Sequence, residues 1–92
     1  MDAPAQQPDE LFAWTDGRVV LFVDHTDAAL IVARGWRRGD RLTDVRRWSF
    51  DSERRATGQV RRLVGEATGD PFAADATAGE FTGWLATRSQ LA

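Results

Sequence analysis

The sequence feature that most constrains the fold is a pair of β-branched and aromatic runs joined by Asp16-Gly17. The runs cover residues 11–15 and 18–23. Asp-Gly is the dipeptide best suited to the positive φ angles of a tight hairpin turn, so the two runs are predicted to pair as antiparallel strands. The chain is therefore expected to open its folded part with a β-hairpin.

A second reversal is predicted at the polar tetrapeptide of residues 24–27, which leads into an apolar run over residues 28–34. Residues 35–40 hold two glycines and several charges and are predicted as a loop. A fourth strand, with less regular alternation, is expected over residues 42–50. Because the second and third runs are apolar on both faces, both faces need cover, whether from helices or from a second subunit.

A helix is predicted after the strands, ending near Thr68. Asp51 or Ser52 can accept hydrogen bonds from the free amides of its first turn, and Glu53 complements the helix dipole there. Gly69 suits the left-handed residue that follows a helix. The apolar residues at helical spacing are Ala56, Val60, Leu63, Val64 and Ala67. A stripe of this kind packs one helix face on a sheet.

Asp70-Pro71 predicts the start of a second helix, with the aspartate as cap and the proline in the first turn. This helix is expected to extend to about Arg88. A capping box over residues 77–80 offers an alternative start. The apolar side of the helix consists of Ala74, Ala78, Phe81, Trp84 and Leu85.

The predicted fold class is α+β, an antiparallel sheet of three to four strands followed by two α-helices. With 92 residues the chain has room for one domain, expected over residues 10–92, and the polar residues 1–9 are predicted as a disordered tail. The chain has no cysteine, no run of roughly 18 apolar residues and no N-terminal signal-peptide pattern. These absences predict a cytoplasmic protein that does not span a membrane.

Charge is strongly segregated along the chain. Ten arginines and four carboxylates between Arg34 and Arg62 leave that segment with a net charge of +6. The segments before and after it carry −5 and −3, which restores the overall −2. Such asymmetry points to an anionic partner, although a solvated charged face is an equally good explanation.

The basic segment is the candidate binding site, and nucleic acid is the expected partner. Arginine neutralises phosphates and releases counterions, while Trp36 and Trp48, interleaved with arginines, are able to stack on unpaired bases. Core packing is the alternative role for both tryptophans. The predicted nucleic-acid-binding residues are Arg34, Trp36, Arg37, Arg38, Arg41, Arg46, Arg47, Trp48, Arg54, Arg55, Arg61 and Arg62.

The four helix arginines are predicted to share the face opposite the apolar stripe, together with Gly58 and Gly65. Each glycine costs helix stability of roughly 1 kcal/mol relative to alanine, which suggests a close approach of another group to the helix there. The phosphate backbone of a nucleic acid or the helix of a second subunit would fit closely against these glycines. Neutral sequence drift is the third explanation. A homodimer is expected from the apolar strands. The alternative function is a protein-interaction module that docks an acidic partner without nucleic acid.

The sequence offers few candidate catalytic residues, and neither an enzyme nor a cofactor is predicted. His25, the one imidazole, stands beside Asp24 and Asp27 in a predicted turn, where a polar turn explains these residues better than a metal site. There is no cysteine nucleophile, and no glycine-rich phosphate loop follows a strand.

Three segments carry a family resemblance: RVVLFVD at residues 18–24, LIVARGW at residues 30–36, and WSFDSE at residues 48–53, where an amphipathic helix opens. Together they resemble the positive cofactor four type of transcriptional coactivator over about residues 18–64. This resemblance implies a curved four-stranded antiparallel sheet backed by a helix, a dimer, and binding of single-stranded DNA by the strands. RRWSF at residues 46–50 is similar to the arm-binding domains of phage integrases, which also read DNA with a sheet. Both likenesses predict a DNA-binding, transcription-associated protein.

Overall fold

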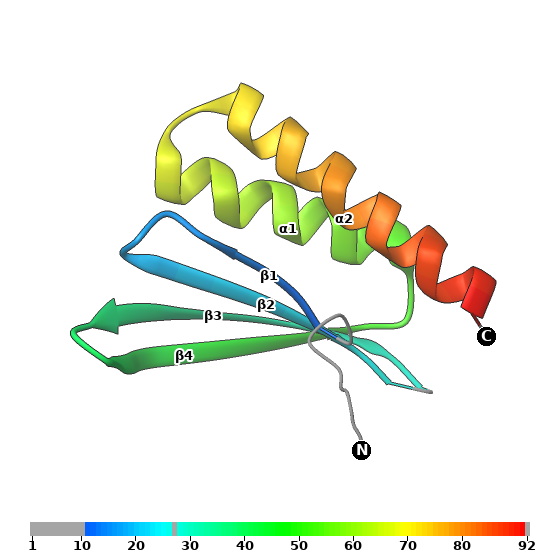
Figure 1. The fold of residues 1–92 in the computed structure, drawn as a ribbon, viewed down its shortest axis with the longest axis horizontal. Helices are drawn as coiled ribbons and strands as arrows, with labels where there is room; N and C mark the ends of the chain where they lie inside the picture. Colours follow the sequence, from blue (N-terminus) through cyan, green and yellow to red (C-terminus); the bar gives the residue numbers. More distant parts are fainter. Residues whose placement is uncertain (1–10, 27, 92) are drawn as a thin grey trace, which may run out of the picture.

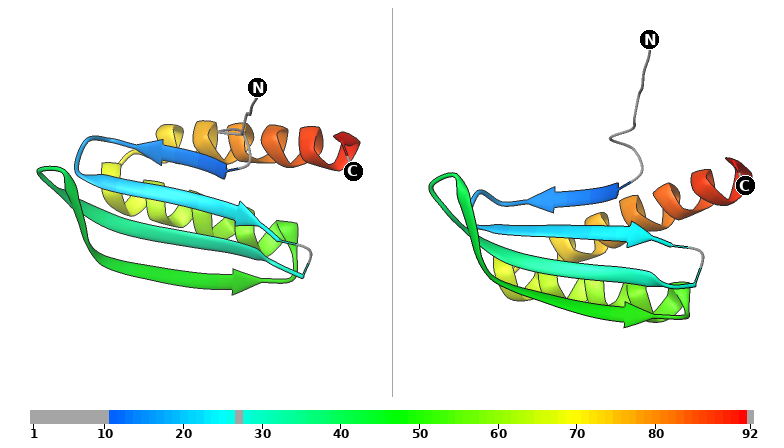
Figure 2. Two further views of the ribbon diagram at one scale, coloured as in Figure 1. Left: turned by 60° about the horizontal axis from the view of Figure 1, so that its bottom comes forward. Right: turned by 90° about the horizontal axis from the view of Figure 1, so that it is seen from below.

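A computed structural model describes residues 11–26 and 28–91. Within these residues four strands form one antiparallel sheet in the order β1-β2-β3-β4, and two helices follow (Figure 1). The elements are β1 Leu11–Thr15, β2 Val19–His25, β3 Leu30–Arg38, β4 Arg41–Phe50, α1 Glu53–Thr68 and α2 Pro71–Leu91. Both helices lie on the same side of the sheet (Figure 2). The predicted α+β class is confirmed, and the predicted tail at residues 1–9 lies outside the described residues.

The β1–β2 turn forms as Asp16-Gly17 predicted. Gly17 has a φ of 97°, a conformation that side chains other than that of glycine rarely adopt. The backbone N–H groups of Val19 and Arg18 both donate to Asp16 Oδ1 at 2.9 Å. These two hydrogen bonds favour the charged carboxylate and lower the pKa of Asp16 below its usual value.

The lowered pKa of Asp16 predicts a pH-dependent contribution to stability. A carboxyl whose pKa is lower in the folded state stabilises the fold fully above its unfolded pKa of about 3.9, and this contribution is lost as the pH falls through the folded value. We expect wild type to melt at a higher temperature than Asp16→Asn at pH 6, with the difference shrinking towards pH 2. The measurement is Tm across this range. A difference that stays constant with pH would contradict the prediction, since Asn keeps an acceptor oxygen and lacks only the charge.

The β3–β4 hairpin is longer than the sequence predicted. Residues 35–38, predicted as loop, continue β3, and only Gly39 and Asp40 separate the two strands. The loop prediction was wrong because Gly35 is a buried strand residue paired with Val20, rather than a turn residue. Gly39 makes the turn, with a φ of 64° at the first position, where a two-residue hairpin loop favours glycine.

The irregular alternation of β4 has a structural cause. The β3–β4 register shifts between Arg34 and Trp36, and Asp44 has a φ of 53°. A bulge of this kind adds one residue to a strand and changes the face to which later side chains point. Leu42 and Val45, which a strict period of two would place on opposite faces, therefore both lie near Gly35.

Both helices begin at the predicted signals, and α1 also ends at one, whereas α2 continues past the expected Arg88 to Leu91. Ser52 is the N-cap of α1, since its side chain accepts from the N–H of Arg55 at 3.3 Å, and Gly69 ends this helix with a φ of 68°. Asp70 Oδ1 accepts from the N–H of Phe72 at 2.9 Å and caps α2. The alternative start of α2 at residues 77–80 is wrong, because Thr77 is buried inside the helix.

The core lies between the sheet and the helices. α1 packs on β3 and β4, and α2 packs on α1 and β1. Phe81 of α2 is fully buried, with its ring 5.3 Å from that of Phe12 and 5.8 Å from that of Trp84. The buried core residues are Phe12, Leu21, Val23, Leu30, Val32, Ala56, Val60, Leu63, Val64, Ala74, Phe81 and Leu85. No described element covers the opposite face of the sheet, so helices supply only half of the expected cover.

Candidate nucleic-acid interface

The β3–β4 hairpin carries arginines past the end of its neighbour. The pairing of β2 with β3 ends at Val19 and Trp36, whereas the pairing of β3 with β4 continues to Arg38 and Arg41. The tip of the ribbon therefore projects beyond β2, at the left of Figure 1. A projecting ribbon presents its side chains to a partner on both faces.

Arg37 is anchored at the base of this tip. Its N–H donates to the Arg18 carbonyl at 2.6 Å, and its Nε donates to the Gly39 carbonyl at 3.3 Å. Arg37, Arg38 and Arg41 are all exposed. Three guanidinium groups thus lie within five residues of backbone at the tip of one hairpin.

Arg34 contacts both tryptophans that the sequence singled out. Its guanidinium carbon is 5.8 Å from the centre of the Trp36 ring and 5.9 Å from that of Trp48, within the range of cation–π contacts. Arg46 lies opposite Arg34 in the strand register. Trp48 is half-buried and packs against the core, which favours the core-packing role for this residue. Trp36 is 36% exposed and remains accessible to a ligand.

A small pocket opens beside this cluster. Its lining residues are Val19, Arg34, Trp36, Leu63, Glu66 and Ala67. Glu66 is the one acidic residue there, and it was not among the predicted site residues. The available signal was its four-residue spacing from Arg62 on α1, whose Nε donates to Glu66 Oε2 at 3.2 Å.

One pair of helix positions faces α2, not an external partner. Arg61 Nε donates to Asp75 Oδ1 of α2 at 3.0 Å. Gly65, one turn later, also faces α2, because a Cβ built there would lie 3.7 Å from the Cβ of Ala74. The close neighbour of Gly65 is therefore the second helix of the same chain. Gly58 faces open space, with no atom within 4 Å of a built Cβ.

The four helix arginines are all exposed opposite the buried stripe of α1, which agrees with the prediction, but they divide between two flanks of that face. Arg62 is one residue, about 100°, further around α1 than Arg61, and it pairs with Glu66 beside the pocket instead of with α2. Arg61 follows Arg54 by seven residues, almost two full helical turns, so these two arginines lie on the same flank of α1. Arg55 and Arg62 share the other flank for the same reason. The sequence pattern identified this exposed face but not the neighbours of its two flanks.

Ion pairing divides the eleven arginines from Arg18 to Arg62 into two groups. Arg18, Arg61 and Arg62 each lie within 3.6 Å of a carboxylate oxygen. In the part of the chain that the structure describes, eight arginines make no ion pair: Arg34, Arg37, Arg38, Arg41, Arg46, Arg47, Arg54 and Arg55. These eight, which we call the unpaired arginines, follow one another along β3, β4 and the first turn of α1.

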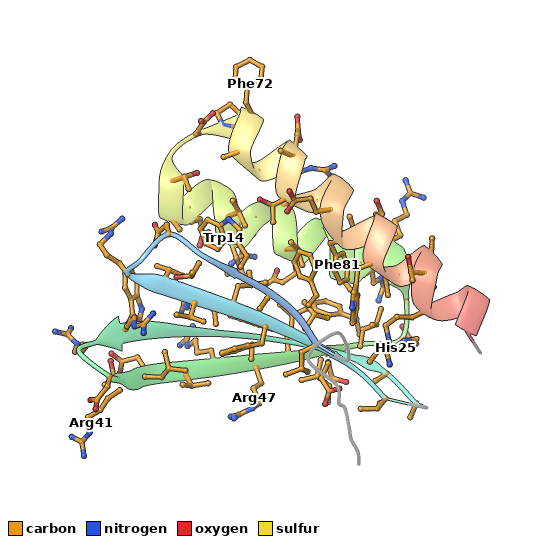
Figure 3. The ribbon with its side chains drawn as sticks, viewed as in Figure 1. Trp14, His25, Arg41, Arg47, Phe72 and Phe81 are labelled. Carbon is orange, nitrogen blue, oxygen red and sulfur yellow. The ribbon has the colours of Figure 1, made fainter. Side chains whose placement is uncertain are left out.

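The unpaired arginines wrap around the β4 edge of the sheet. Arg41 and Arg47 point to the side away from the helices (Figure 3). Arg34 faces the helices, and Arg46 shares its face because the two are paired in register. Positive charge is therefore presented on both sides of this edge.

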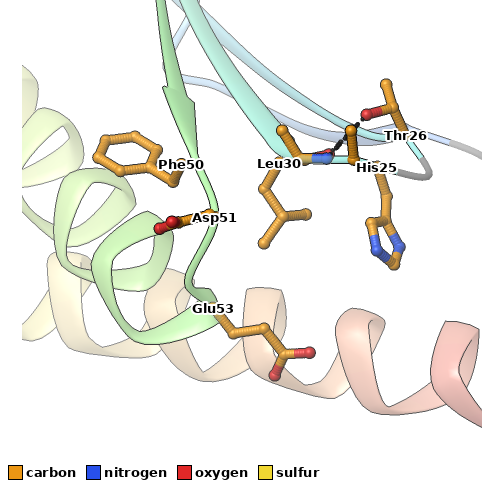
Figure 4. A pocket seen from close by; sticks show the side chains of 8 residues that line it. His25, Thr26, Leu30, Phe50, Asp51 and Glu53 are labelled. Atoms are coloured by element: carbon orange, nitrogen blue, oxygen red, sulfur yellow. Dashed lines mark hydrogen bonds between the residues drawn. The ribbon is translucent and has the colours of Figure 1, made fainter.

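His25 lines a different pocket, at the opposite end of β3 (Figure 4). The prediction of a turn at His25 was wrong, since it is the last residue of β2 and pairs with Leu30. Asp51 and Glu53 also line the pocket, but in Figure 4 the Asp51 carboxylate points away from the imidazole. Among residues 11–26 and 28–91, no group of three or more metal-ligating side chains is placed to hold an ion. Asp27 lies outside the described residues.

None of the described helices is long and apolar enough to span a membrane.

No protein-family model, curated protein or solved structure matches this chain. The resemblance to the positive cofactor four type of coactivator therefore stays a prediction. The candidate interface stands on its own geometry: a projecting basic hairpin, an exposed tryptophan, and arginines without carboxylate partners among the described residues.

Proposed function

We propose that this protein is a small nucleic-acid-binding regulator associated with transcription, which binds single strands, most naturally of DNA, along the β3–β4 edge. The observation that carries this proposal is the run of unpaired arginines beside the exposed ring of Trp36. In a chain of net charge −2, carboxylates are plentiful, yet they do not neutralise this edge.

The chemistry of the edge suits a polyphosphate. Each guanidinium presents fixed N–H donors to phosphate oxygens, and each phosphate contact releases condensed counterions. The hairpin presents these donors on both sides of one sheet edge, within reach of a strand of nucleotides that passes over that edge. The free ring surface of Trp36 then offers a base a platform that does not depend on sequence.

The test is a titration of the full chain with labelled single-stranded and double-stranded oligonucleotides of equal length at two salt concentrations. We expect tighter binding to the single strand and a linear fall of log affinity with log salt concentration. Equal affinity for both forms would remove the stacking role, and failure to bind either form at low salt would overturn the proposal. An acidic protein partner, which would use the same arginines, then becomes the favoured alternative.

The variant Trp36→Ala should distinguish the contribution of base stacking to binding from the contribution of charge. We expect its affinity for single strands to fall about tenfold, near the low end of the roughly 1–3 kcal/mol measured for stacking platforms, because Arg34 already occupies part of the indole surface. The salt dependence should stay unchanged, since no phosphate contact is lost. Binding at several salt concentrations measures both quantities.

The outcome depends on the variant staying folded, which its circular dichroism and Tm report. If Trp36→Ala unfolds the protein, the ring is a core residue and the stacking role is wrong. A folded variant with unchanged affinity would contradict stacking just as directly.

A further inference from the structure

The small pocket beside Trp36 lies between the strands and α1. Its lining combines the indole ring of Trp36, the guanidinium of Arg34 and the carboxylate of Glu66 with three apolar side chains. Its volume is about 80 Å³, less than the roughly 90 Å³ that three waters take up in the liquid. A pocket of this size admits the edge of one small ring whose face lies over the exposed indole.

Arg34 and Glu66 line the same pocket but do not pair with each other. Within the described residues, the Arg34 side chain makes neither an ion pair nor a hydrogen bond, and its Nε is buried without an acceptor. A guanidinium that is partly removed from water and has no acceptor is destabilised. A ligand that brings an acceptor to Arg34 therefore gains more than the same contact would give in open solvent.

Glu66 is held in place by Arg62, one turn earlier on α1. The Nε of Arg62 donates to Oε2 of Glu66 at 3.2 Å. No hydrogen bond among the described residues uses the other oxygen, Oε1. Because the Glu66 side chain is 57% exposed, a ligand reaches this oxygen from solvent. The ion pair on α1 thus presents one acceptor to the pocket.

The two charges disfavour a simple ion as the ligand. A free anion in the pocket would meet the carboxylate of Glu66, and a free cation would meet the guanidinium of Arg34. A neutral planar ring with a donor at one position and an acceptor at another satisfies both groups. Such a ring also stacks on Trp36, and a nucleobase has all three properties.

We propose that this pocket takes one cytosine of the bound strand, stacked on Trp36. The amino group at N4 donates to Glu66, as it does to carboxylates that read cytosine, and the carbonyl oxygen O2 accepts from Arg34. Thymine carries a carbonyl oxygen in place of the amino group, and the carboxylate repels it. The small volume favours a pyrimidine over a purine. This inference rests on the proposed function and adds a base preference to a platform that has none by itself.

A base within a strand suits the pocket better than a free nucleotide does. Arg37 and Arg38 directly follow Trp36 in β3, so they lie near the phosphates that flank a base stacked there. We expect cytidine monophosphate to displace a labelled cytosine strand only at a concentration at least about 100-fold above that of the same unlabelled strand, because it offers one phosphate. Displacement at equal concentrations would make a free nucleotide the ligand and overturn the strand assignment.

Fluorescence anisotropy of the full chain with two thymine oligonucleotides, one of which carries a single central cytosine, tests the base preference. We expect about tenfold tighter binding of the cytosine strand, the low end of discrimination by base contacts. A cytosine analogue that lacks the amino group should lose most of this gain.

The outcomes separate this inference from the proposed function. Equal affinity for the cytosine and thymine strands, or tighter binding of a central purine, would overturn the cytosine pocket and leave single-strand binding intact. An analogue that binds as cytosine does would overturn the contact between the amino group and Glu66. Failure of every strand to bind at low salt would overturn both proposals.

Glu66→Gln should remove the preference, because its amide accepts from the amino group of cytosine and donates equally to the carbonyl of thymine. We expect its affinities for the two strands to agree within about twofold. The matched control is Asp75→Asn, which removes the same charge from another exposed carboxylate that pairs with an α1 arginine, Arg61, and should keep the preference. An unchanged preference in Glu66→Gln, or an equal loss in both variants, would overturn the proposal.

Discussion

Phe81→Ala is expected to lower the free energy of unfolding by about 3–5 kcal/mol, the usual cost of deleting a fully buried phenylalanine. Phe81 has no exposed surface and contacts the rings of Phe12 and Trp84, so its removal leaves a cavity where α2, β1 and the sheet meet. Figure 3 shows this ring between α2 and the sheet. Urea denaturation at constant temperature measures the change.

Phe72→Ala is the matched control, because it deletes the same side chain from a position that is 82% exposed. Its effect on the free energy of unfolding should stay within about 0.5 kcal/mol, as for ordinary surface substitutions. Equal effects of the two variants would mean that α2 does not pack on the sheet through Phe81. Figure 3 shows Phe81 well away from Arg41 of the hairpin tip, so a folded Phe81→Ala chain should bind oligonucleotide as wild type does.

Replacing Arg37, Arg38 and Arg41 together with glutamine is expected to reduce affinity for single-stranded oligonucleotide about 100-fold near 0.1 M salt. Each phosphate contact to a single strand contributes about 0.7 to the slope of log affinity against log salt concentration, so three lost contacts lower the slope by about 2. The three arginines are exposed and make no ion pair within the described residues, and the fold should tolerate their removal. Fluorescence anisotropy over a series of salt concentrations gives both numbers.

A second triple variant separates local contacts from net charge. Glutamine at Arg18, Arg61 and Arg62 removes the same three charges, but from arginines that already lie beside carboxylates. We expect this variant to keep most of the affinity and nearly the full salt slope. Equal losses in the two triple variants would show that the oligonucleotide responds to overall charge and that the hairpin tip is not the interface.

The predictions that held rest on signals that act within a few residues. Asp16-Gly17, Ser52, Gly69 and Asp70 determine turns and helix ends through hydrogen bonds and φ angles that involve neighbours at most four positions away. The apolar stripe of α1 identified its buried face for the same reason, since helix geometry is itself local.

The loop prediction that failed, and the details that no prediction supplied, concern contacts between distant segments. Gly35 suggested a turn by its type, but its role depends on Val20, fifteen residues earlier, and on the β4 bulge that lies against it. The split of the helix arginines depends on where α2 returns, because Asp75 and Ala74 occupy one flank of α1 and leave the other beside the pocket. No local propensity contains that information.

The candidate site shows the same division. By itself, the sequence determined that arginines and tryptophans concentrate between residues 34 and 62, because composition requires no coordinates. Only the tertiary structure decided that Trp48 joins the core, that Trp36 stays accessible, and which arginines find carboxylates. It also decided that both helices cover the same face of the sheet, so that no described element covers the opposite face. Burial and ion pairing depend on residues that are far apart in the sequence, and these residues come into contact only when the chain folds.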